Sequence, residues 1–166
     1  MKKQRHRPAP RRKPLRAERK KPPVARTPDW DIAFEDKLEG YDALVPPEPG
    51  EWLEMDDTEK QILVEAYHER EGIEVPNMTV HAIMHTVVEN QLADPNEARV
   101  RLKLAQLMGE GLDRHDAIHA IAAVLASYMN RILKSGQPVP QHSEPYYEAL
   151  GRLTKESWYK DFGEEK

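Results

Sequence analysis

Two stretches decide the fold: residues 78–89, MTVHAIMHTVVE, and residues 114–125, RHDAIHAIAAVL. Each has apolar residues at helical spacing and a pair of histidines four positions apart. The pairs are His81 with His85 and His115 with His119, and Glu89 follows His85 by four residues. Side chains four apart on a helix lie above one another, so each predicted helix presents two imidazoles in the same direction.

Helical periodicity continues outward from these two stretches. It predicts helices at about 57–71, 78–92, 95–109, 114–134 and 144–158, with Asn77, Asp94 and Asp113 as N-caps of the second, third and fourth. A further short helix fits 30–38, and Pro46, Pro47, Pro49 and Gly50 predict a turn-rich linker. The predicted fold class is all-α, a small helical bundle of four to five helices with a disordered basic N-terminal tail.

The charge divides the chain into three parts. Residues 1–26 hold 12 Lys and Arg and one acid, Glu18, whereas the rest holds 13 Lys and Arg and 28 Asp and Glu. Residues 1–28 are also rich in proline and have few apolar side chains, so we expect them to be a disordered basic tail. Residues 29–55 form an acidic linker, and residues 56–160 form the helical bundle domain.

The charge division bears on partners. Residues 2–26 are predicted to contact nucleic acid or another anionic surface, because Lys and Arg near phosphates release counterions. The alternative is a solvated tail that aids solubility or contacts the acidic bundle of the same chain. The acidic bundle is a candidate surface for a protein partner or for homo-oligomer formation. These features describe a non-enzymatic interaction module.

Several classes of protein are excluded by what the sequence lacks. It has no cysteine, so disulfides, zinc knuckles and thiol nucleophiles are excluded. No apolar run approaches the roughly 18 residues of a membrane span, and the basic N-terminus lacks the apolar region of a secretory signal. A cytoplasmic location is expected. Glycine-rich phosphate loops and serine nucleophile motifs are absent.

The histidine pairs suggest a metal site. In an alternating bundle, the second and fourth helices run parallel, which places both pairs at the same end. The predicted ligands are His81, His85, His115 and His119, with Glu89 as an auxiliary ligand or orienting group. These donors suit Zn, Fe, Ni or Cu. The alternative is a histidine-rich polar seam without metal, and His68 is expected to be a solvated surface side chain. Binding is favoured over catalysis, and the sequence predicts no reaction or substrate.

The same motifs resemble those of a bacterial family catalogued as a domain of unknown function, number 1841. The first segment of that family is similar to His81, His85 and Gln91. The second is similar to His-Asp-Ala-x-His at 115–119, followed by an apolar helix and the Ser-Gly turn at 135–136. A Tyr-x-x-x-Leu motif is similar to Tyr146 and Leu150. The resemblance covers roughly residues 76–153. It implies that both histidine pairs belong to the shared domain, and it implies no activity.

Overall fold

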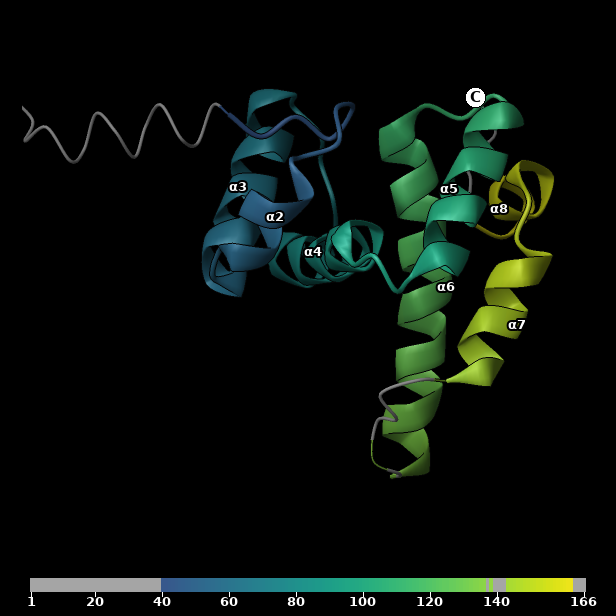
Figure 1. The fold of residues 1–166 in the computed structure, drawn as a ribbon. Coiled ribbons are helices and arrows are strands. Elements are labelled where there is room, and N and C mark those ends of the chain that lie inside the picture. Colours follow the sequence, from purple (N-terminus) through teal and green to yellow (C-terminus); the bar gives the residue numbers. More distant parts are fainter. Residues whose placement is uncertain (1–39, 137, 139–142, 163–166) are drawn as a thin grey trace, which may run out of the picture.

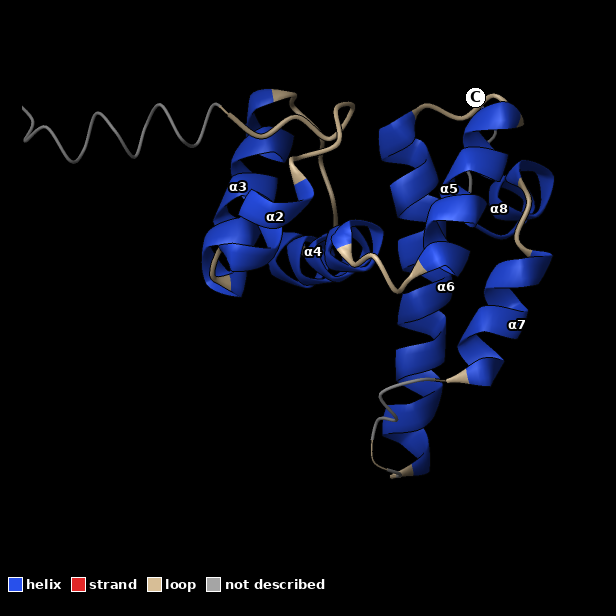
Figure 2. Cartoon of the chain, viewed as in Figure 1, coloured by secondary structure: helices blue, strands red, loops and turns tan. Residues whose placement is uncertain are grey.

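The protein is all-α in the computed structural model, which describes residues 40–136, 138 and 143–162 (Figures 1 and 2). The basic tail and the short helix predicted at 30–38 lie outside this part. The described residues form seven helices, more than the four to five predicted. None of these helices is both long enough and apolar enough to cross a membrane. The helices are α2 (Pro49–Glu54), α3 (Asp57–Arg70), α4 (Met78–Ala93), α5 (Ala98–Gly109), α6 (Arg114–Ser135), α7 (Glu144–Arg152) and α8 (Lys155–Phe162).

Capping side chains set the starts of the long helices. Asn77 accepts a hydrogen bond from the Val80 amide at the start of α4, and Asp113 accepts one from the Asp116 amide at the start of α6. Both caps are the ones predicted, and Gly136 ends α6 at a φ of 66°. The α3 cap is Asp56, whose side chain accepts a hydrogen bond from the Thr58 amide.

The remaining differences from the predicted helices also come from capping. Helix α5 begins at Ala98 because Asp94 ends α4 and its carboxylate accepts the Asn96 amide in the intervening turn. The predicted 144–158 helix is divided at Thr154, which exchanges hydrogen bonds with Ser157 in a capping box and so starts α8. Helix α2 forms where a linker was predicted, because Pro49 occupies its first turn and Glu48 caps it.

Helix α4 is the central element of the fold. It contacts α2, α3, α5 and α6. In Figure 1 it is seen nearly end-on, whereas α6 runs along the plane of the picture. The two helices therefore cross and do not run parallel as predicted, and the N-terminal half of α6 packs against α4. This crossing brings their histidines together.

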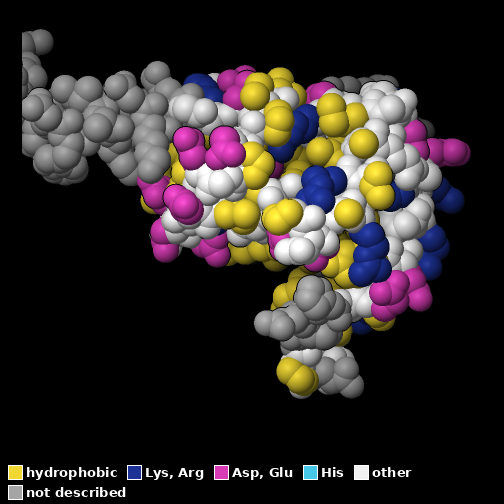
Figure 3. Space-filling view, in the orientation of Figure 1, with side chains coloured by type: hydrophobic (Ala, Val, Ile, Leu, Met, Phe, Trp, Pro, Cys, Tyr) yellow, Lys and Arg dark blue, Asp and Glu magenta, His cyan; other side chains and the backbone are white. Residues whose placement is uncertain are grey.

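Two apolar clusters flank α4. The larger one joins α5, α6 and α7, and its buried residues include Ile118, Ile121 and Leu125 of α6. The smaller one includes Tyr41, Trp52, Val64 and Tyr67. Tyr41 and Trp52 belong to the segment interpreted as an acidic linker, so residues 41–55 pack into the folded domain. Acidic side chains gather over the end of the molecule formed by α2 and α3, and the face in Figure 3 exposes no histidine of the described residues.

Candidate metal centre

Four histidines from three helices converge between α3, α4 and α6. The Nε2 atom of His68 lies 2.8 Å from Nε2 of His81, 3.0 Å from Nε2 of His115 and 3.5 Å from Nε2 of His119. One nitrogen from each of the four rings lies within 4.8 Å of the others. The structure therefore brings together three of the predicted histidines and adds His68, which was expected to be solvated.

His68 lies on the buried face of α3. The buried residues of this helix are Lys60, Leu63, Val64, Tyr67 and His68, which follow the spacing i, i+3, i+4, i+7 and i+8. Ile62 lies off this stripe and is 38 % exposed. Extending the buried stripe from Val64 by four residues places His68 on the inner face of the helix. This spacing is the feature of the sequence that could have identified His68.

The hydrogen bond on the far side of the His68 ring fixes its tautomer. Nδ1 of His68 lies 2.7 Å from the Val64 carbonyl oxygen. A carbonyl oxygen can only accept, so Nδ1 carries the proton and Nε2 presents a lone pair to the other three rings. Metal-ligating histidines are held in the same way by a carbonyl or carboxylate on the opposite nitrogen.

The distances from His68 Nε2 to the other three nitrogens are close to those between ligands around a small ion. A tetrahedral ion bonded to imidazole nitrogens at about 2.0–2.1 Å separates those nitrogens by about 3.3 Å. The three distances measured from His68 Nε2 lie on either side of this value. Four rings that meet through Nε2 with this spacing could hold one transition-metal ion.

His85, also predicted as a ligand, lies beside the group of four. Its ring centroid is 5.5 Å from that of His68 and 5.7 Å from that of His119, and its side chain is fully buried. Among the described residues, no polar atom is within hydrogen-bonding distance of its Nε2. Its Nδ1 has only a long contact, 3.5 Å, with the Tyr41 hydroxyl.

Glu89, the predicted auxiliary ligand or orienting group, is paired with Arg114. The guanidinium donates to both carboxylate oxygens, at 2.8 and 2.7 Å, and the Tyr41 hydroxyl donates to Oε1 at 2.8 Å. Arg114 also donates to the Ala43 carbonyl oxygen at 2.7 Å. The structure does not bring Glu89 into the group of four. It connects the carboxylate to His85 through Tyr41, and it links the 41–55 segment to α4 and α6.

Burial keeps the histidines in the neutral form that binds metal. Desolvation, followed by repulsion from neighbouring imidazoles, lowers the pKa of His81 to about 4 and that of His119 to about 2. Desolvation and the neighbouring His68 lower the pKa of His115 to about 4. Burial also lowers the pKa of His68, although the Val64 carbonyl partly opposes this shift. At neutral pH the group therefore carries lone pairs and no net charge.

These lowered pKa values predict that the metal-free protein loses stability as the pH falls from about 6.5 to about 4. In the unfolded chain the histidines take up protons near pH 6.5. In the folded protein His81 and His115 take them up only near pH 4. Between these values the unfolded state binds more protons, so the free energy of unfolding decreases on acidification, and the contributions of His81 and His115 level off below about pH 4.

Urea denaturation midpoints between pH 7.5 and 5 measure this effect above the range in which most carboxylates titrate. The His81→Gln variant should lose less stability over the interval, because that side chain no longer takes up a proton on unfolding. A denaturation midpoint that is constant from pH 7.5 to 5 would contradict the inferred burial of the neutral imidazoles.

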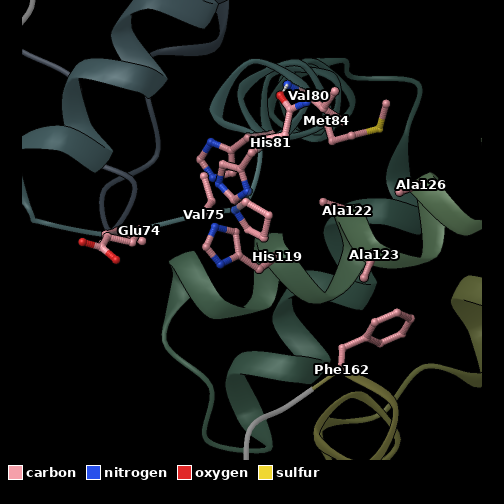
Figure 4. Close-up of a pocket in the computed structure, with 14 residues that line it drawn as sticks. Glu74, Val75, Val80, His81, Met84, His119, Ala122, Ala123, Ala126 and Phe162 are labelled. Carbon is pink, nitrogen blue, oxygen red and sulfur yellow. Dashed lines mark hydrogen bonds between the residues drawn. The ribbon is translucent and has the colours of Figure 1, made fainter.

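A cavity of about 580 Å³ adjoins the histidine group. Figure 4 shows His81 and His119 at one side of it, with Met84 above and Ala122, Ala123 and Ala126 along α6. His85 also lines this cavity, whereas His68 and His115 do not. Two of the four converging rings therefore border both the candidate metal position and the cavity.

Comparison with known proteins identifies no relative of this chain. No family model, curated protein or solved structure matches it. The functional interpretation therefore depends on the geometry of the chain itself.

Proposed function

We propose that the protein binds one transition-metal ion through Nε2 of His68, His81, His115 and His119. The observation that carries this proposal is the approach of three Nε2 atoms to a single lone pair on His68. That lone pair can accept one good hydrogen bond. In a histidine-rich polar seam without metal, the remaining Nε2 atoms that face His68 would therefore have no good hydrogen-bond partner there. A cation at the centre accepts a lone pair from every ring.

The donor set restricts the kind of metal. Neutral imidazoles suit Zn, Ni, Cu and Fe, whereas Mg and Ca require oxygen ligands. Glu89 is the only buried acid among the described residues, and Arg114 holds both of its oxygens. The candidate site thus offers nitrogen donors and no unpaired buried carboxylate.

Metal-dependent thermal stability tests the proposal. We expect one equivalent of Zn²⁺, Ni²⁺, Cu²⁺ or Fe²⁺ to raise the melting temperature of the tag-free, chelator-treated protein, because the ion binds the folded site preferentially. When the free metal concentration is a hundred times the dissociation constant, the free energy of unfolding rises by about 2.7 kcal/mol. This corresponds to an increase in melting temperature of roughly 5–10 °C for a chain of this size.

Magnesium serves as the matched control ion and should leave the melting temperature unchanged. A transition metal that shifts the wild type and a His68→Leu variant equally would place its binding elsewhere in the chain. No shift with any of the four transition metals would remove the proposal.

A further inference from the structure

The cavity beside the histidine group has the form of a small-molecule site. Its volume, about 580 Å³, lies in the range of about 300–1,000 Å³ that such sites occupy. Most of its lining is apolar and comes from residues 73–77, α4, α6 and Phe162 of α8. The imidazoles stand together at one side (Figure 4). This arrangement suits a ligand with an apolar body and one polar end.

The alanines of α6 provide the room. Ala122, Ala123 and Ala126 follow His119 by three, four and seven residues, so they continue along the same side of the helix. These small side chains line the cavity opposite Val80 and Met84 of α4.

The charge of the centre favours an anionic polar end. An ion held by four neutral imidazoles keeps its full positive charge, and Arg114 already neutralises the nearby buried Glu89. Glu74 lines the cavity but is exposed, and Figure 4 shows its carboxylate pointing away from the histidines. A ligand that carries its own negative charge would balance the ion.

His85 supplies an independent sign of a ligand. Its side chain is fully buried, lines the cavity, and has an Nε2 atom with no partner among the described residues. A buried polar atom without a hydrogen bond is costly. The polar end of a ligand placed between the metal and His85 would give this nitrogen a partner.

We propose that this cavity binds a small monocarboxylic acid, with its carboxylate on the metal and its hydrocarbon chain along Met84, Ala122 and Ala126. The inference rests on the proposed metal binding. Zinc in catalytic sites can expand from four ligands to five, and the carboxylate would be the fifth ligand here. His81 and His119, the two proposed ligands that border the cavity, mark the side on which the carboxylate would approach.

Cobalt-loaded full-length protein tests this inference, because the visible spectrum of Co²⁺ reports changes in its ligands. We expect acetate, butanoate and hexanoate to perturb the spectrum with increasing affinity, by roughly fourfold for each added CH₂ group that enters the cavity. Hexan-1-ol, which has the same chain length but no charge, should bind much more weakly than hexanoate. Equal binding of hexan-1-ol and hexanoate would overturn the choice of an anion.

Filling the cavity provides the matched variants. Ala126→Leu should remove the gain for the longer acids, and Ala122→Leu, closer to His119, should remove it for shorter ones as well. Ser127→Leu places the same side chain on an exposed position of α6 and should keep the wild-type series. Cobalt stoichiometry and circular dichroism establish that each variant is loaded and folded.

The outcomes distinguish the two proposals. If Co²⁺ does not bind, the metal site is wrong and the ligand site falls with it. If Co²⁺ binds but affinity does not depend on chain length, or if both alanine variants keep the wild-type series, the metal site stands and the carboxylate site is overturned.

Discussion

Replacing His68 with leucine should lower the affinity for the transition metal by about a hundredfold or more. Structural zinc binding contributes about 10–16 kcal/mol over four ligands, so one ligand accounts for roughly 3 kcal/mol. His68 is the ring that the other three approach, at 2.8, 3.0 and 3.5 Å. Isothermal titration with Zn²⁺ in the presence of a competing chelator measures the loss.

Leucine separates loss of a ligand from loss of the fold. His68 is fully buried and its neutral ring packs among apolar and imidazole neighbours, so a leucine of similar size should leave the metal-free protein folded. The Val64 carbonyl that loses the Nδ1 hydrogen bond lies within a helix. Unchanged zinc affinity in a folded His68→Leu variant would contradict the assignment of His68 as a ligand.

Replacing Arg114 with alanine should destabilise the protein by about 3–5 kcal/mol, because the Glu89 carboxylate then stays buried without its cation. The two side chains are 5 % and 1 % exposed, and Nη2 of Arg114 lies 2.7 Å from Oε2 of Glu89. The Ala43 carbonyl oxygen also loses a donor. The free energy of unfolding of the metal-free protein, from urea denaturation, measures the effect.

An exposed ion pair provides the control. Arg99 and Glu144 are 3.0 Å apart but 53 % and 68 % exposed, so Arg99→Ala should cost about 1 kcal/mol or less. The Arg114→Met, Glu89→Met double variant should recover much of the stability lost on replacing Arg114 alone, since it removes both buried charges. A similar cost for Arg114→Ala and Arg99→Ala would show that the buried pair is not an important stabilising contact.

Local signals predicted most of the helices. Asn77 and Asp113 cap α4 and α6 as expected, and Gly136 ends α6. The errors arose where two signals overlapped: Asp94 ends α4 where it was expected to start α5, and Thr154 caps α8 inside a continuous helical pattern. Helix α2 is six residues long, and the prolines before it predicted a turn equally well.

The candidate site was partly predictable because i and i+4 spacing requires no knowledge of packing. His81, His115 and His119 meet, although the parallel arrangement used to place them together was wrong. The position of α4 between several helices was not predictable from its sequence. A helix covered on several sides has no single apolar stripe, so the apolar Val80 is 51 % exposed while His85 is fully buried.

The roles of His68 and Glu89 could not be predicted from i, i+4 spacing within one helix. His68 is the only histidine in α3, so no pair with i, i+4 spacing marks it and only the buried stripe of the helix could identify it. The histidines that it meets lie on other helices. Glu89 follows the histidine row in sequence, but Arg114, 25 residues away, determines its role. Contacts of this range depend on how the helices cross, and no local pattern encodes the crossing of α4 and α6.

X-ray absorption at the zinc edge, on full-length tag-free protein loaded with one equivalent of Zn²⁺, tests the proposed centre. We predict one bound ion with four imidazole nitrogens at about 2.0–2.1 Å. An ion surrounded mainly by oxygen ligands, or a protein that retains no zinc, would contradict the assignment of His68, His81, His115 and His119 as a metal centre.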